Sequence, residues 1–291
     1  MVLHQVKYLI NGNILPLSIQ RQRISEKLLI ESVMGDGYTD SSIGLMGHVV
    51  AYVGVESKEN VNYFDTAEDY LNLFLYLYTL QTGQPWIKFT NVGFEIESYS
   101  DLGKISPGFP GFSQIIHEGE SLERHKQSIT SLCELFHYIE SDYVTIINSP
   151  LGLALQFFYD AIMSNHRRRI ELAVVHFMIA AESLVVLGEE SKRQNVSKRI
   201  GALIAESDGE YEEIYKKMKK MYDIRSGIVH GGSKVASPKD VQTLYIYLRK
   251  ATLERLSLKQ ISKKELVKKL DEISVDWKIK NELQSMRTFQ N

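Results

Sequence analysis

The chain has 291 residues, of which 44% are hydrophobic, 24% charged and 10% aromatic, which is typical of one large globular domain or two ordinary ones. No apolar run reaches the roughly 18 residues that a membrane span needs, and the first residues lack the pattern of a signal peptide. Cys133 is the only cysteine, which excludes an internal disulfide and a cysteine-based zinc site, so we expect a cytoplasmic protein.

Charge is distributed unevenly along the chain. Residues 1–120 hold 7 Lys/Arg and 14 Asp/Glu, whereas residues 151–291 hold 25 and 18. The whole chain is therefore no general binder of polyanions, but its C-terminal half could attract phosphate in a salt-dependent way.

The first hundred residues predict a mixed α/β region. One helix is expected there, because Asp65 to Glu68 offer a capping start and apolar residues at helical spacing continue to Gly83. Strand-like runs, separated by turn signals, lie at 5–10, 28–32, 48–55 and 86–96.

The Pro/Gly-rich stretch at 106–112 predicts the domain boundary. It separates a mixed α/β sensor or regulatory domain at 1–110 from a helical domain at 120–291. Within the helical domain, 170–187 is apolar nearly all round, which is typical of the central helix of a bundle. The other helices are expected at 121–138, 150–164, 196–206, 211–225, 239–255, 263–272 and 274–286. The predicted fold class is α+β, a mixed α/β region followed by an all-α helical bundle.

One carboxylate, Glu182, interrupts the apolar central helix. Because burying an unpaired carboxylate costs several kcal/mol or forces it to take up a proton, we expect a cationic partner, with arginine the usual one. Glu182 could simply pin two helices together, or it could orient a catalytic arginine.

The candidate arginine is Arg225, in the string Arg-Ser-Gly-Ile-Val-His-Gly-Gly that ends with Gly232. The apolar stripe suggests that the helix continues to His230, with Gly231 and Gly232 as a left-handed end. Arg225 and His230 are five residues apart, about 140° around the helix and roughly 7–8 Å along it, so a phosphate could lie between them. The negative end of the helix dipole favours a protonated His230, which suits proton transfer.

This string resembles the Arg–(four to six residues)–His signature of the HEPN superfamily, and of its Apea-like branch in particular. The Ala-Ala-Glu-Ser-Leu segment that carries Glu182, about forty residues before the Arg-Ser segment, resembles the same branch. The match covers roughly residues 150–255.

The resemblance implies a HEPN-type up-and-down bundle of four to five helices that pairs with a second copy, so that two Arg–His motifs face each other. Active members are ribonucleases that cut RNA without a metal ion or other cofactor. Carried over, His230 would transfer protons and Arg225 would hold the phosphate, with Ser226 at the polar position and Glu182 in support. By analogy, related proteins act in antiviral defence or toxin-like growth control.

Other basic residues could meet the RNA backbone. Arg167, Arg168 and Arg169 lie between two predicted helices, and Lys219 and Lys220 lead into Arg225. Solvated surface groups are the plainer interpretation of both sets.

Two further functions stay open at this stage. A HEPN domain could bind RNA or a partner without cutting, or the motif could be structural, with Glu182–Arg225 as an internal salt bridge and His230 as a helix cap.

Overall fold

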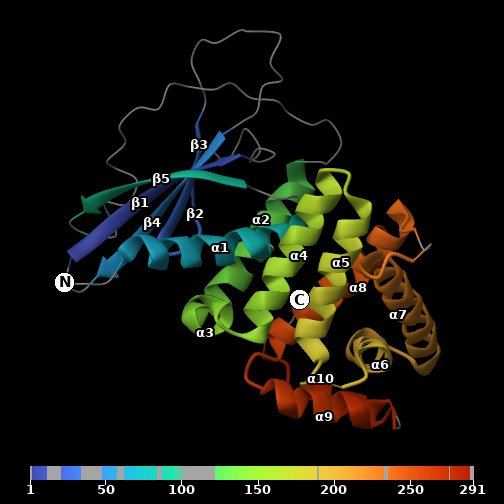
Figure 1. Cartoon of the computed structure of the whole chain (residues 1–291). Coiled ribbons are helices and arrows are strands. Elements are labelled where there is room, and N and C mark those ends of the chain that lie inside the picture. Colours follow the sequence, from blue (N-terminus) through green and yellow to red (C-terminus); the bar gives the residue numbers. More distant parts are fainter. Residues whose placement is uncertain are drawn as a thin grey trace. The chain divides into compact units, whose positions relative to one another are not determined.

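The computed structural model describes residues 2–11, 21–33, 48–57, 62–83, 87–96, 98, 100, 122–188, 190–232, 235–274 and 276–288 (Figure 1). The chain divides into two compact units, Met1–Thr145 and Ile146–Asn291. The fold class is α+β, as the sequence predicts, with the strands in the first unit and helices throughout the second.

The first unit contains a five-stranded antiparallel sheet in the order β2-β3-β4-β1-β5 (Figure 1). Its strands are β1 Val2–Asn11, β2 Arg21–Arg23, β3 Leu28–Val33, β4 His48–Ser57 and β5 Ile87–Ile96. The four predicted strands are confirmed, whereas β2 has no sequence signal because it is three polar residues long.

Helix α1, Tyr63–Thr82, packs against β4 and β1. Its N-cap is Asn62, whose side chain accepts a hydrogen bond from the Phe64 amide at 3.1 Å. The capping start expected at Asp65 is therefore wrong by one turn, because the amide side chain of Asn62 caps equally well. Gly83 ends the helix as predicted, with a φ of 71°.

Helix α2, Leu122–Glu140, also belongs to the first unit. Phe136 packs edge-on against Tyr70 and Phe74 of α1, with ring centroids 5.2 and 5.7 Å apart. The sequence interpretation placed this helix in the C-terminal domain. The stretch at 106–112, where we expected the boundary, lies outside the described residues, and the division falls within α3, Tyr143–Ile147.

The second unit is a bundle around α5, Ile170–Val185, which contacts α4, α6, α7, α8 and α9 (Figure 1). Its central position is as predicted, and the side chains of Ala173, Phe177 and Ala181 are fully buried. The surrounding helices are α4 Pro150–His166, α6 Lys192–Ile204, α7 Asp208–Val229, α8 Pro238–Ser257, α9 Lys263–Ile273 and α10 Ile279–Ser285.

Two predicted helix starts are corrected. Helix α6 begins at Lys192 instead of at 196, without a side-chain cap that the sequence could reveal. Helix α10 begins at Ile279 instead of at 274, because Asp276 forms a turn first: its carboxylate accepts from the Lys278 amide at 3.0 Å, and its carbonyl accepts from the Ile279 amide at 3.3 Å.

Candidate functional site

Helix α7 carries the Arg–His motif at its C-terminal end. Its N-cap, Ser207, accepts from the Glu210 amide at 3.3 Å, and a buried stripe that includes Met218, Met221 and Ile224 faces the bundle. The helix ends at Val229, so the predicted end at His230 is confirmed to within one residue, whereas the helix starts at Asp208 instead of at 211.

The glycines after the motif turn the chain back on itself. His230 is the C-cap and Gly231 has a φ of 71°, the left-handed conformation that glycine adopts at low cost. The Gly232 amide donates to the Gly227 carbonyl at 2.7 Å. A Cβ added to Gly232 would lie 3.1 Å from the Gly227 Cα, so the backbone that approaches Gly227 is the chain's own turn.

Glu182 has a cationic partner, as the sequence predicts, and the structure adds a second one, Lys192. One carboxylate oxygen, Oε2, accepts from Lys192 Nζ at 3.1 Å, and the other, Oε1, lies 3.9 Å from Arg225 Nη2. The side chains of Glu182 and Arg225 are 12% and 21% exposed. Arg225 forms no hydrogen bond with this carboxylate, and the closer partner is Lys192 from the start of α6.

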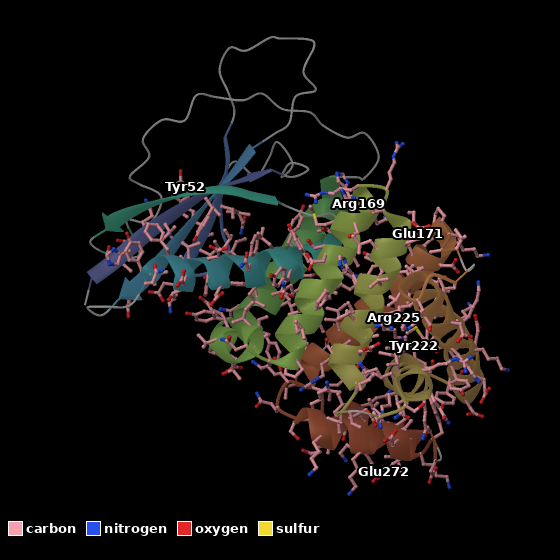
Figure 2. The ribbon with its side chains drawn as sticks, in the orientation of Figure 1. Tyr52, Arg169, Glu171, Tyr222, Arg225 and Glu272 are labelled. Atoms are coloured by element: carbon pink, nitrogen blue, oxygen red, sulfur yellow. The ribbon has the colours of Figure 1, made fainter. Side chains whose placement is uncertain are left out.

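Tyr222 completes the surroundings of Arg225 (Figure 2). The guanidinium carbon lies 5.7 Å from the centroid of the Tyr222 ring, a cation–π distance. Burial, followed by the negative charge of Glu182, raises the pKa of Tyr222. Arg225 is therefore held between a carboxylate on α5 and an aromatic ring on its own helix.

His230 differs from Arg225 in its surroundings. His230 is exposed, and its backbone amide donates to the Ser226 carbonyl at 3.1 Å. No side chain in the described part of the chain forms a hydrogen bond with its ring. An exposed imidazole can exchange protons with a bound molecule. Among the described residues, one end of α7 thus carries an exposed histidine and an arginine that lies 3.9 Å from a carboxylate, without direct contact between the two.

A basic groove of about 510 Å³ lies beside α7, and its lining includes Arg193, Lys216, Lys219 and Lys220. Lys220 pairs with Asp240 at 3.1 Å, whereas the Lys219 ammonium lies 5.6 Å from the centroid of the Tyr215 ring. We call this the α7 groove. Sequence reasoning missed Arg193 as a groove residue.

Arg193 holds one wall of the α7 groove in place. Its guanidinium donates to both oxygens of Asp223, at 2.5 and 2.7 Å, which joins α6 to α7. No sequence signal links two residues thirty positions apart, so this contact could be found only in the folded chain.

Arg167, Arg168 and Arg169 form the exposed turn between α4 and α5, where Figure 2 labels Arg169. Arg168 has a φ of 58°, which L-residues rarely adopt. The Arg169 amide donates to the Ser164 carbonyl at 2.9 Å and the Arg168 amide to the Asn165 carbonyl at 2.8 Å, the hydrogen bonds of a Schellman turn. The three side chains are available to solvent but are not joined to Arg225 by any contact in the described residues.

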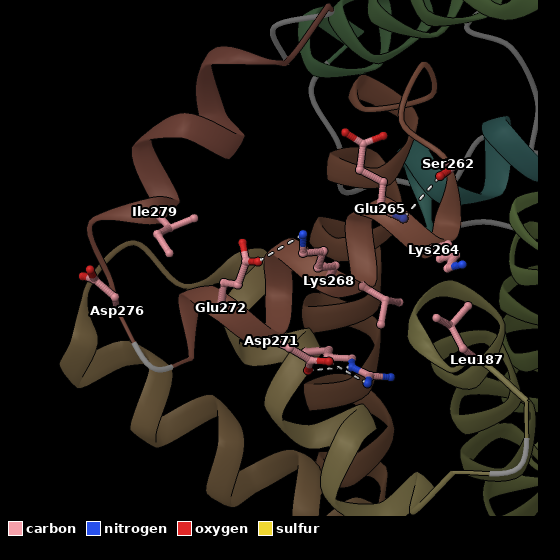
Figure 3. Close-up of a pocket in the computed structure, with 11 residues that line it drawn as sticks. Leu187, Ser262, Lys264, Glu265, Lys268, Asp271, Glu272, Asp276 and Ile279 are labelled. Carbon is pink, nitrogen blue, oxygen red and sulfur yellow. Dashed lines mark hydrogen bonds and ion pairs between the residues drawn. The ribbon is translucent and has the colours of Figure 1, made fainter.

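A second concave surface, of about 940 Å³, lies between α6, α9 and α10 (Figure 3). At its base Arg199, which is 4% exposed, donates to both carboxylate oxygens of Asp271 at 2.9 Å. On its rim Lys268 lies 3.9 Å from Glu272. Because these charges are paired with each other, this surface has the character of structural packing.

No known family model, curated protein or solved structure matches the chain. Within the described residues, no three His, Cys, Asp or Glu side chains come together as metal ligands, and no helix is long and apolar enough to span a membrane.

Proposed function

We propose that the second unit is a HEPN-type, metal-independent endoribonuclease whose composite site forms in a homodimer. The observation that carries the proposal is His230, which is exposed and whose ring has no hydrogen-bond partner among the described residues. It follows the helix that carries Arg225, whose guanidinium lies 3.9 Å from the Glu182 carboxylate. The motif supplies a group for proton transfer and a cation for phosphate, the two requirements of RNA cleavage by the ribose 2′-hydroxyl.

The proposed chemistry needs no group beyond these side chains and the RNA. His230 takes the proton of the 2′-hydroxyl, whose oxygen attacks the adjacent phosphorus while the bond to the 5′-oxygen breaks. The departing oxygen takes a proton from the imidazolium of the partner copy, and the product ends in a 2′,3′-cyclic phosphate. Arg225 stabilises the additional negative charge on the phosphate in the transition state.

The α7 groove suits the approach of the RNA backbone. Lys219 precedes His230 by eleven residues, close to three helical turns, so both lie on nearly the same side of α7, about 16 Å apart along its axis. A strand whose phosphates contact Lys216, Lys219 and Arg193 would therefore lead towards His230. The acidic first unit has the charge of a regulatory domain rather than of an RNA-binding one.

Exposed apolar side chains beside the motif support the dimer. Val229, which directly precedes His230, is 48% exposed, and Val235, which follows the glycine turn, is 75% exposed. Apolar residues at such positions gain free energy when a second copy covers them.

A cleavage assay with a matched histidine control tests the proposal. Wild-type protein incubated with mixed RNA in EDTA releases fragments that end in cyclic phosphate, and His230→Ala lowers the rate by at least about 100-fold because proton transfer is lost. The control is His166→Ala, which removes another exposed histidine at the end of a helix. Equal rates for wild type and His230→Ala, with unchanged helical circular dichroism, would refute the role of His230.

A second candidate is an RNA-binding module that does not cut. The observation in its favour is that the Arg225 side chain is 21% exposed and directed to Glu182, so less of it is free for phosphate than in an open site. Under this function RNA stays intact, and Arg225→Ala weakens RNA binding in a filter or polarisation assay.

A further inference from the structure

A groove of about 570 Å³, whose lining includes Glu182, lies between the starts of α4, α6 and α9. Its volume is in the range of small-molecule sites. We call it the Lys263 groove. Of its described lining residues, only Glu182 has a part in the proposed nuclease site.

One wall of the Lys263 groove is aliphatic. It consists of Ile147, Pro150, Leu153, Ile179 and Val186, and no described lining residue is aromatic. Leu153 is 44% exposed, which is unusual for a leucine inside a helix of a bundle. The wall can cover a short hydrocarbon body, but it offers no ring on which a nucleotide base could stack.

The charged residues of the Lys263 groove favour an anion. Lys263 is half-buried, and its ammonium forms no ion pair or hydrogen bond with any residue that the structure describes. Burial lowers the pKa of Lys263. The negative charge of Glu190 partly opposes this lowering, and the positive charges of Arg255 and Arg199 reinforce it. An ammonium in this position gains from an anionic ligand, because a ligand can supply the direct counter-charge that no described residue provides within ion-pair distance.

Lys192, the other cation at the groove, uses only part of its hydrogen-bonding capacity within the described residues. It donates to Glu182 at 3.1 Å, and two of its three N–H groups remain for a ligand. Glu182 is the sole acidic residue in the described lining, and its charge is balanced by Lys192 and Arg225. The groove therefore carries a net positive charge beside an aliphatic wall.

We propose that the Lys263 groove binds a small aliphatic anion, an acyl or alkyl chain that ends in a carboxylate or a phosphate. The anionic group lies between Lys263 and Lys192, and the chain lies along Leu153 and Ile179. This inference is independent of the proposed ribonuclease function.

The test uses the full chain and four probes: octanoate, octyl phosphate, 1-octanol and adenosine monophosphate, each at millimolar concentration. Octanoate or octyl phosphate raises the melting temperature and gives a binding isotherm by calorimetry, whereas uncharged octanol and the nucleotide do not. No shift with either aliphatic anion, an equal shift with octanol, or a shift with the nucleotide alone would overturn the proposal.

Lys263→Met and its neighbour Lys264→Met form a matched pair on α9, because Lys264 lies outside the groove. Lys263→Met weakens binding of the anion about tenfold or more, since one charge-assisted contact is lost, and Lys264→Met leaves it unchanged. The free Lys263→Met protein is as stable as wild type or more so, because an unpaired, half-buried charge is removed. A structural Lys263 would instead make this variant less stable.

A second variant keeps the proposal testable if Lys263→Met does not fold. Leu153→Glu changes an exposed residue on the aliphatic wall and places a negative charge in the groove. We expect it to fold normally and to abolish binding of both aliphatic anions; undiminished binding would contradict the proposed site.

Discussion

Arg168 occupies a backbone conformation in which most Schellman turns have glycine. Its φ of 58° costs a residue with a Cβ about 1 kcal/mol. Arg168→Gly should therefore raise the free energy of unfolding by about 1 kcal/mol, measured by urea denaturation. Arg167→Gly is the control, because Arg167 has a φ of −83° and gains nothing from glycine. If Arg168→Gly is the less stable of the two variants, strain at this turn is not the dominant effect.

A costly conformation in a run of three exposed arginines suggests that the side chain has a use beyond folding. Contact with RNA phosphates would supply that use under the proposed function. The same Arg168→Gly protein would then bind RNA more weakly while being more stable.

Lys280, near the start of α10, has a buried ammonium group that contacts the C-terminal end of α6. Lys280 is only 3% exposed. Its Nζ donates to the carbonyls of Ala202 and Leu203, in the last turn of α6, at 2.6 Å each. Burial lowers the pKa of Lys280 from 10.5 to about 8. A neutral amine still has N–H groups for both carbonyls.

The lowered pKa of Lys280 determines the direction in which its contribution to the free energy of unfolding changes with pH. Below pH 8 the folded and unfolded chains both hold the proton, so the full cost of burying the charge opposes folding. Between pH 8 and 10.5 the unfolded chain binds more protons, so the contribution of Lys280 to the free energy of unfolding rises with pH. Urea denaturation on both sides of pH 8 should show this rise in wild type and in the exposed control Lys278→Met, and not in Lys280→Met. Identical pH profiles for all three proteins would contradict a depressed pKa.

The residues of the candidate site were only partly predictable. A lone carboxylate in an apolar helix demands a cation, so the need of Glu182 for a cationic partner follows from the chemistry of burial. Arg225 was singled out by the motif in which it lies. Lys192 was missed because the sequence placed the start of α6 at 196, which left Lys192 outside the helix. Arg193 pairs with Asp223 across thirty residues, and no local pattern encodes such a contact.

At the scale of elements, one arginine joins three parts of the bundle. The Arg199 guanidinium donates to Asp271 of α9, to Glu190 before α6, and to the Val185 carbonyl at the end of α5 at 2.9 Å. The hydrogen bond from Arg199 is the largest of the effects that lower the pKa of Glu190. Removal of this buried cation deprives two carboxylates of their shortest charged contacts and leaves them near the protein interior.

Arg199→Met should therefore lower the free energy of unfolding by about 3 kcal/mol, measured by urea denaturation. The neighbouring Lys198→Met is the control, because Lys198 is 3.9 Å from Asp271 and partly exposed, and it should cost less than about 1 kcal/mol. Equal losses in the two variants would show that the buried network contributes no more than a surface ion pair.

Long elements were predictable from periodicity, and short ones were not. Apolar spacing over many residues identified α1, α5 and α7, because the apolar residues of a helix face that packs on a core recur at every turn of the helix. The strand β2 and the helix α3 have three and five residues, too few for a repeat to appear. The division at Thr145 was also unpredictable, because α2 packs on α1 through aromatic contacts between distant residues.

At the scale of the whole molecule, the two units differ in architecture and in charge. The excess of Asp/Glu lies with the sheet, and the excess of Lys/Arg lies with the helical unit. Binding of RNA to the second unit should consequently weaken as salt rises, because phosphate contacts release counterions. The central claim, that this unit cuts RNA through His230, concerns chemistry rather than binding.

The most direct test of that claim compares two oligonucleotides of one sequence, one all RNA and one with 2′-deoxyribose at every position, incubated with wild-type protein in EDTA. The account predicts that the RNA is cut to products with 2′,3′-cyclic phosphate ends and that the deoxy strand stays intact, because the attacking 2′-hydroxyl is absent. Cleavage of both strands, or of neither, would contradict it.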